Sequence, residues 1–235
     1  MFGLVTSDAV VLSSSSDFAP GGTMMKSDMQ WIHKVGERTL VALHGDPSDC
    51  AYVLEVLQAT ERDHAMNVVE DAQDYPLSTS ALAHCCRRAI AEVLRSRPLR
   101  VNALLAGWAS SGGCTGAGRP VLYTVDQLAS LQRVPFAAHG QDLPAILSVL
   151  DRGFGVRTHA GPCLDVDVDV DLSGGGGGAG IVPESGRSPR FGRDDGVVLA
   201  REVWSALRKR STAAGPLAAV AIRGVQRDGV FSIDE

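Results

Sequence analysis

Residues 94–152 read LRSRPLRVNALLAGWASSGGCTGAGRPVLYTVDQLASLQRVPFAAHGQDLPAILSVLDR, and this stretch decides the fold. Two apolar segments in it, residues 99–106 and 120–125, predict strands, and from Val101 onward the first is apolar on both faces apart from Asn102. Such a strand must be covered on both sides, by a second sheet and by helices. Residues 142–151 follow with apolar side chains at helical spacing. The pattern indicates a layered α+β sandwich rather than a helical bundle.

Further strands are expected on either side of this stretch. Residues 2–5 and 10–14 flank a small polar turn and predict a hairpin at the start of the sequence. Residues 39–43 predict another strand. Near the other end, residues 217–222 and 230–233 flank an Asp-Gly pair and predict a final hairpin.

Apolar residues recur at helical spacing from residue 48 onward and predict a helix, for which Asp46 or Ser48 is the expected N-cap. A second helix is expected at residues 78–97 and a last one around residues 197–207. The apolar positions on the buried sides of the first two helices are Cys50, Val53, Leu54 and Leu57, and then Leu82, Cys85, Cys86, Ile90, Val93 and Leu94.

The pattern breaks down between residues 153 and 193. This segment holds alternating aspartates at residues 165–171 and an unbroken glycine run at residues 174–178. Because poly-glycine carries the largest entropic cost of ordering, we expect a flexible Gly/Asp-rich surface insertion there. The rest of residues 1–235 is expected to form a single domain.

Composition narrows the class of protein. With 235 residues, 45% apolar side chains and a net charge of −5, the chain reads as an ordinary globular protein with no reason to bind nucleic acid. Five cysteines, an odd number without a Cys-x-x-Cys pair, indicate reduced thiols rather than disulfides or zinc ligands. The opening residues lack the features of a secretory signal, and no apolar run approaches the ~20 residues that span a bilayer.

In their order and spacing these segments resemble the β subunits of the 20S proteasome, and most closely the type-4 (β4) subunit. The similarity covers nearly the whole chain outside residues 153–193. It implies a four-layer αββα sandwich of the N-terminal-nucleophile hydrolase type, with two antiparallel sheets between helix pairs, assembled into seven-membered rings. The segments that carry it are residues 94–97, 101–107, 122–123, 135–140 and 150–152, with anchors at Asp8, Met25, Lys26, Asp28, Gly45 and Asp49.

Active members of this family carry an N-terminal threonine that supplies the hydroxyl nucleophile and the assisting amine, together with a lysine and an aspartate that orients it. In one ungapped register over residues 3–45, the aspartate position falls on Ser15, the lysine position on Trp31, and the threonine position before Met1. The serine of the family's Gly-Ser-Gly turn corresponds to His139. The resemblance therefore implies an inactive subunit with no catalytic residues.

A register slip of two residues would bring Asp17 to the aspartate position, since it preserves the strand face. It would still leave His33 where the lysine belongs. Trp31 could fill the vacated cleft or pack against a neighbouring subunit, and both roles are structural.

The remaining reactive residues have simpler explanations. His139 is expected to be a structural or interface histidine, and the adjacent thiols of Cys85 and Cys86 are expected to pack in the core, because neighbouring helical positions point about 100° apart. The aspartates at 165–171 indicate a solvated acidic segment rather than a Mg²⁺ or Ca²⁺ site. The glycines between residues 112 and 118 lack the ending of a phosphate loop, which favours a plain strand connection. No cofactor and no metal are expected.

The expected function is that of a structural, non-catalytic β4-type subunit that helps to close the β ring and the chamber for ubiquitin-dependent protein degradation. Its partners would be the other α and β subunits of a 28-subunit particle, and regulatory caps through that particle, in the cytoplasm and nucleus. No nucleic-acid or membrane partner is expected. Residues 24–26 and the third helix are expected to contact neighbouring β subunits.

Two alternatives stay open. One is a self-standing hydrolase of the same fold, or one that uses Ser110 or Cys114 with a histidine such as His139. The other is a diverged paralogue that acts outside the particle as a binding module.

Overall fold

The computed structural model describes residues 1–18, 25–67, 77–109, 118–158, 191–210, 220–227 and 229–234. These residues form two five-stranded sheets, with strand orders β10-β9-β2-β1-β8 and β3-β4-β5-β6-β7, and every strand pair is antiparallel. The strands are β1 (Phe2–Val5), β2 (Ala9–Ser15), β3 (Ile32–Val35), β4 (Thr39–Gly45), β5 (Val101–Ala109), β6 (Arg119–Val125), β7 (Leu131–Arg133), β8 (Phe136–Ala138), β9 (Val220–Gln226) and β10 (Gly229–Asp234). The helices are α1 (Pro47–Asn67), α2 (Thr79–Val93), α3 (Leu143–Thr158) and α4 (Arg193–Arg210).

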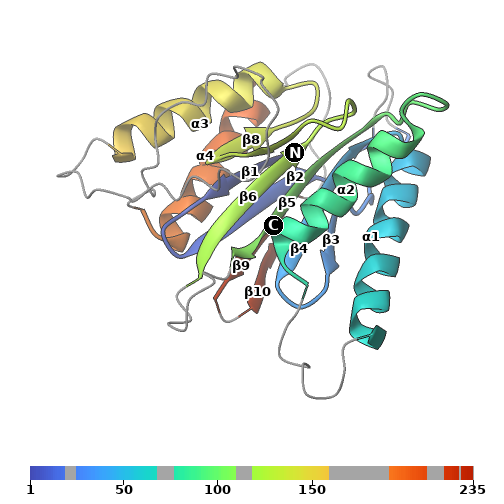
Figure 1. Ribbon diagram of the computed structural model, residues 1–235. Helices are drawn as coiled ribbons and strands as arrows, with labels where there is room; N and C mark the ends of the chain where they lie inside the picture. Colours follow the sequence, from blue (N-terminus) through green and yellow to red (C-terminus); the bar gives the residue numbers. More distant parts are fainter. Residues whose placement is uncertain are drawn as a thin grey trace, which may run out of the picture.

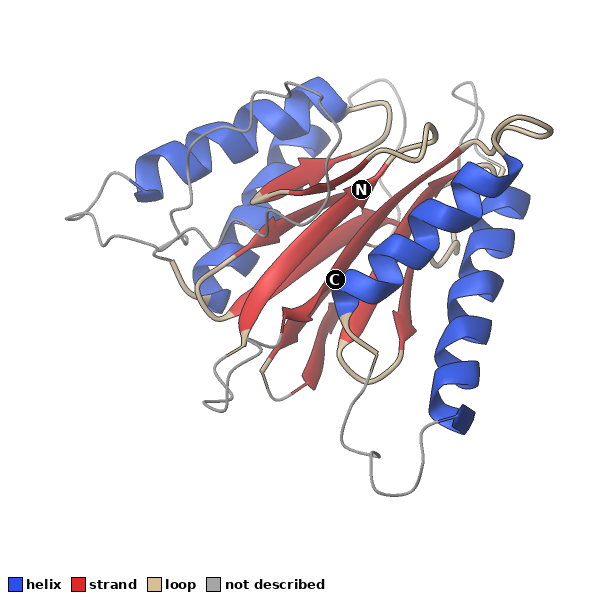
Figure 2. Cartoon of the chain, viewed as in Figure 1, coloured by secondary structure: helices blue, strands red, loops and turns tan. Residues whose placement is uncertain are grey.

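The two sheets lie face to face between two helical layers. Helices α1 and α2 cover the sheet that contains β5, and α3 and α4 cover the sheet that contains β1 (Figure 1). The same view coloured by element shows the order helix, sheet, sheet, helix (Figure 2). The expected four-layer αββα sandwich is confirmed.

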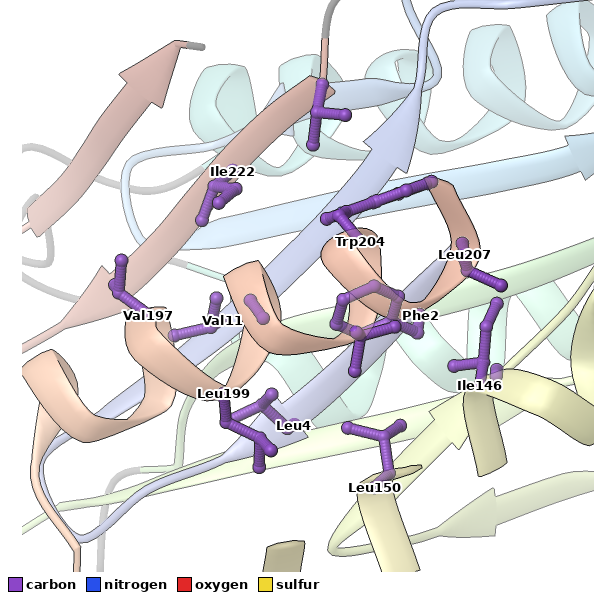
Figure 3. Close-up of a cluster of buried hydrophobic side chains, with 14 of the residues drawn as sticks. Phe2, Leu4, Val11, Ile146, Leu150, Val197, Leu199, Trp204, Leu207 and Ile222 are labelled. Carbon is purple, nitrogen blue, oxygen red and sulfur yellow. The ribbon is translucent and has the colours of Figure 1, made fainter. Parts of the chain in front are cut away.

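Three apolar clusters hold these layers together, one under each helical pair and one between the sheets. Strand β1 shows how the alternation of side chains serves two of them. Phe2 and Leu4 face α3 and α4, where they meet Trp204, Leu199 and Leu150 (Figure 3). Val5 faces the opposite sheet. A Cβ on Gly3 would press against Leu12 and Leu122, so glycine permits the close approach of the sheets there.

The strand predictions are confirmed in their main parts. The opening hairpin forms with Phe2 opposite Ser13, and β5 is covered on both faces, since Leu105 joins the cluster under α1 and α2 while Leu104 lies between the sheets. Strands β3, β7 and β8 were not predicted, because each is only three or four residues long and none alternates clearly. In the final hairpin, residues 217–219 and 228 lie outside the described residues.

The ends of the first two helices are set by capping and by proline. Helix α1 begins at Pro47, and Asp46 acts as its cap because the Asp46 carboxylate accepts a hydrogen bond from the Ser48 amide at 2.9 Å. Helix α2 is capped by Ser78 and ends at Val93, so the predicted end at residue 97 is wrong. The residue before a proline avoids the helical conformation, so Pro98 disfavours helix at Arg97, the predicted last residue.

Helix α3 is longer than predicted, which corrects the start of the insertion. Residues 153–158 belong to this helix, and Phe154 is buried in the core. The Phe154 ring lies 4.8 Å from the ring of Phe136 and 5.1 Å from that of Phe191. These contacts place both flanks of the segment in the core, and residues 159–190 lie outside the described residues. In the described part of the chain, no helix is both long and apolar enough to cross a membrane.

Candidate functional site

The candidate site lies where β1 begins, β4 ends and β8 ends. Met1 and His139 exchange two hydrogen bonds of 2.9 Å, from the Met1 amine to the His139 carbonyl and from the His139 amide to the Met1 carbonyl. This exchange extends the pairing of β1 with β8, in which Phe2 lies opposite Ala138. The backbone therefore brings the segment of residues 135–140 to the start of the chain, 138 positions away in sequence.

The His139 imidazole is fixed by β6. Its Nε2 atom lies 3.0 Å from the Thr124 hydroxyl oxygen, within hydrogen-bonding distance. Burial, together with the positive amino terminus, lowers the pKa of His139 to about 4. The ring is therefore neutral at neutral pH, and it is a weak base.

A second histidine lies beside it at the end of β4. The His44 ring sits 6.2 Å from the ring of Trp31 and against Gly140, where a Cβ would lie 3.6 Å from the imidazole. Gly140 has a φ of +119°, which favours glycine at this turn. Burial, the amino terminus and His139 lower the pKa of His44 to about 4. The site thus holds two neutral imidazoles close to one another.

Trp31 occupies the position that the resemblance gives to a lysine. It is 7% exposed and belongs to the cluster under α1 and α2, with its ring 5.9 Å from the ring of Phe18. Its carbonyl accepts a hydrogen bond from the Leu43 amide at 2.9 Å, which fixes its backbone beside β4. Of the two roles expected for Trp31, the structure favours the filling of space inside its own chain. Lys34, the nearest lysine in the sequence, is exposed on β3.

The two candidates for the aspartate position lie at the end of β2. Ser15 is the last residue of that strand, and its hydroxyl accepts a hydrogen bond from the Asp17 amide at 3.0 Å. On β3, in the other sheet, His33 is half-buried, and burial lowers its pKa, with a smaller contribution from Arg223. Neither register places a lysine at the position that the resemblance gives to the catalytic lysine, and the loss of that lysine's role stays a prediction.

The Thr124–His139 contact is the one arrangement in the site that resembles a nucleophile with its base. A hydroxyl beside an imidazole supplies two of the three members of a hydrolytic triad. An imidazole whose conjugate acid has a pKa of about 4 takes up a proton poorly at neutral pH, so the pair is badly matched to general-base chemistry. Sequence reasoning did not find Thr124, because the contact depends on β6 lying beside the end of β8.

Several other candidates can now be placed. The expected core role of the adjacent thiols is confirmed, since Cys86 is fully buried and Cys85 packs partly buried in the same cluster. Burial raises the pKa of Cys50 and of Cys86 to about 12, which keeps both thiols protonated. Ser110, Cys114, the glycines at 112, 113 and 116 and the aspartates at 165–171 lie outside the described residues. Among the described residues, no three His, Cys, Asp or Glu side chains are arranged to hold a metal ion.

The expected contact segment near residue 25 is exposed. Met25 is 69% exposed, and the Lys26 amine forms an exposed ion pair of 3.4 Å with Asp28. Met24 lies outside the described residues. An exposed thioether beside an ion pair can contribute apolar area to a protein contact.

Comparison with known proteins gives the family. The model of the proteasome subunit family matches residues 1–160. A probable proteasome subunit beta type-4 of Neurospora crassa is 34% identical over 153 residues, which are 65% of this chain and 70% of that protein. The proteasome subunit beta type-4 of Saccharomyces cerevisiae is 27% identical over 155 residues, 66% of this chain and 73% of that protein. A proteasome subunit beta type-2-B of Arabidopsis thaliana is 28% identical over 154 residues, 66% of this chain and 72% of that protein.

The family match ends at residue 160, so it does not extend to α4, β9 and β10, to which the expected resemblance reached. It does contain β1, β4, β6 and β8, the four strands that build the candidate site. Because the match spans more than half of the sequence, the chain belongs to the proteasome subunit family.

Proposed function

We propose that this chain is a non-catalytic, type-4 β subunit of the 20S core particle. It contributes one wall of the β ring and of the chamber in which neighbouring subunits cut unfolded proteins during ubiquitin-dependent degradation. The likeness to relatives named beta type-4 supports the subunit type. The cytoplasm and nucleus are its proposed locations.

One observation carries the non-catalytic part of the proposal. Trp31, at the position that the resemblance gives to the lysine of active members, is buried, with Phe18 and His44 packed around it. An indole cannot lower the pKa of a nucleophile as an ammonium group can. The two neighbouring imidazoles, with their pKa values near 4, do not replace that charge at neutral pH.

The partners would be other α and β subunits in a 28-subunit particle, with regulatory caps bound to that particle. Interfaces in obligate assemblies are large, and the isolated subunit depends on them for stability. No cofactor, metal or nucleic acid has a role in this proposal.

Native mass spectrometry of the tagged chain, purified gently from its own cells, tests the proposal. Recovery in a particle with seven kinds of α and seven kinds of β subunit is the expected result. Recovery as a monomer or a small oligomer would contradict it.

The self-standing hydrolase remains the second candidate, because the Thr124–His139 contact gives it a concrete pair of residues. It requires that the isolated chain hydrolyse peptides and that Thr124→Val abolish this activity. We expect no such activity, because His139 is too weak a base at neutral pH.

A further inference from the structure

The outer side of α2 and the loop after it carry an unusual concentration of positive charge. Five arginines lie between residues 87 and 100, where Glu92 is the only carboxylate, and all five are exposed. The chain as a whole has a net charge of −5, so this surface is opposite in sign to the molecule. We call it the arginine patch: Arg87, Arg88, Arg95, Arg97 and Arg100.

The helical repeat gathers the first part of the patch on one face. At about 100° per residue, Arg87 and Arg88 project about 100° apart on the outer side of α2. Arg95 follows just beyond the end of the helix at Val93. The opposite face of α2 carries the buried residues Leu82, Cys86 and Ile90. Only Arg88 has an acidic neighbour on the helix, Glu92, at 3.4 Å. The charge on this face is therefore largely uncompensated.

The second part of the patch stands on a loop whose backbone is held at several points. The Asp49 carboxylate accepts hydrogen bonds from the Arg97 guanidinium at 2.6 Å and from the Arg100 amide at 2.9 Å. The Arg100 carbonyl accepts a hydrogen bond from the Asp46 amide at 2.9 Å. A Cβ on Gly45 would collide with that carbonyl, so the loop lies directly against the end of β4.

Two features of this loop point to recognition rather than to solubility alone. Leu99, between the arginines, is buried in the cluster under α1 and α2, which anchors the loop in the core. A surface that is ordered before binding loses less conformational entropy on association. Guanidinium groups form two parallel hydrogen bonds with carboxylates, and arginine is enriched at the centres of protein interfaces.

We infer that the arginine patch is a docking surface for an acidic protein surface, carried by another subunit of the particle. This inference rests on the proposed function. A protein partner is favoured over nucleic acid because of the net charge of −5 on this chain. An extended polyanion would be repelled by the rest of the chain, whereas a small acidic surface on a protein would contact only the arginine patch.

The test reverses the charge of two arginines that have no structural role in the chain. Arg87→Glu/Arg95→Glu changes the patch and leaves Asp49 with both of its partners. The matched control is Lys34→Glu/Arg62→Glu, which reverses two exposed cations on β3 and α1. Arg87→Gln/Arg95→Gln removes charge without adding any, and serves as the second variant if the reversal impairs folding.

Each tagged variant is expressed in its own cells, and native mass spectrometry gives the fraction of tagged chain in the large particle at increasing KCl. We expect the Glu pair to lower that fraction at least threefold relative to the control, and the Gln pair to lower it less. We also expect wild-type particles to lose the chain as salt rises, because exposed charge pairs are screened.

The outcomes separate the two proposals. A wild-type chain outside any particle would overturn the proposed function and this inference with it. A wild-type chain inside the particle, with all three variants incorporated equally, would overturn only the docking surface. Loss of bound partner on nuclease treatment of the wild-type complex would show that the patch binds nucleic acid, which also contradicts the inference.

Discussion

Trp204 and Trp31 are buried to nearly the same degree, 6% and 7% exposed, yet their surroundings differ in kind. Trp204, on α4, packs its ring 5.9 Å from that of Phe2 and donates a hydrogen bond of 2.7 Å to the Ser13 hydroxyl. That hydroxyl donates in turn to the Ala221 carbonyl at 3.1 Å. Trp31 instead packs beside His44, a group that can take up a proton.

The contacts of Trp204 serve only to stabilise the fold. Those of Trp31 lie in the region where the resemblance places the catalytic groups of active members. Around Trp204 the hydrogen bonds join neutral groups, an indole, a hydroxyl and a carbonyl, none of which titrates between pH 4 and 8. Trp31 lies at the position that the resemblance gives to a lysine, and the pKa values of the two nearby imidazoles are lowered, so both rings are neutral at neutral pH. The first region should respond to lost volume, and the second to charge and to pH.

The largest expected effect comes from truncation in the first region. We expect Trp204→Ala to lower the free energy of unfolding by about 3–5 kcal/mol, because it leaves a cavity and an orphaned Ser13 hydroxyl. Urea unfolding followed by circular dichroism measures this. Trp204→Phe keeps most of the volume and should cost about 1–2 kcal/mol. Equal losses for the two variants would show that the cavity is not what matters.

The second region is tested by returning a lysine to it. We expect Trp31→Lys to lower the free energy of unfolding by about 3 kcal/mol, since it buries an ammonium group in an apolar cluster in place of an aromatic ring. Trp31→Phe, which adds no charge, is the control and should cost less. A Trp31→Lys protein as stable as wild type would mean that the site already accommodates a cation, and the contrast between the two tryptophans would fail.

The same region should make stability depend on pH. His44 and His139 have pKa values of about 4 in the folded chain, against the ordinary histidine value of 6.5 expected in the unfolded chain, so the unfolded state binds more protons between these limits. The contribution of these two histidines to stability is therefore full above about pH 6.5 and is lost as the pH falls toward 4. We expect a total loss on the order of 2 kcal/mol, reduced from the full shift because both rings are only half-buried.

Urea unfolding at a series of pH values measures this slope. His44→Gln should flatten the curve, while Trp204→Phe should shift it without changing its shape. If the unfolding free energy of His44→Gln depended on pH as steeply as that of the wild type, the pH dependence would belong to other groups.

A smaller effect is expected at the loop that carries the arginine patch. Asp49→Asn weakens the hydrogen bonds to Arg97 and to the Arg100 amide and should cost about 1 kcal/mol, because Arg97 is largely exposed. Thermal unfolding compared with Glu55→Gln, an exposed change on the same helix, isolates this contribution. If Asp49→Asn lost more unfolding free energy than Trp31→Lys, this loop would contribute more to stability than the surroundings of Trp31, which contradicts the expected order.

The smallest effect on stability is expected at Lys26. Its ion pair with Asp28 is exposed and 3.4 Å long, so Lys26→Glu should change the unfolding free energy by less than about 0.5 kcal/mol. Because we expect this segment to contact a neighbouring subunit, the same change should lower the fraction of chain in the particle. Unchanged assembly would count against that contact.

The sequence was most informative where periodicity is long and apolar. The faces of α1 and α2 follow from the positions of Val53, Leu57, Leu82 and Ile90, and all four are buried as expected. The short strands β3, β7 and β8 were missed because each has only three or four residues, and β8 also pairs with β1, which is distant in the sequence. The extension of α3 to residue 158 was missed because glycine at position 153 suggested a break, although a Cβ there would crowd Leu199 and glycine thus serves the packing of α3 on α4.

The candidate site was predictable only in part. The replacement of the lysine by Trp31 followed from the resemblance and its register. The approach of His44 to His139, and of His139 to Thr124, did not, because it depends on β4, β6 and β8 ending at the same place. No local pattern encodes such a meeting of three strands.

The central claim is that this chain does no chemistry of its own, and covalent labelling tests it most directly. Particles that contain the tagged chain would be treated with an electrophilic peptide that forms a stable adduct with N-terminal threonine nucleophiles, and each subunit would then be weighed by mass spectrometry. We predict adducts on other β subunits and an unchanged mass for this chain. An adduct on this chain, at Thr124 or at any other residue, would contradict the account.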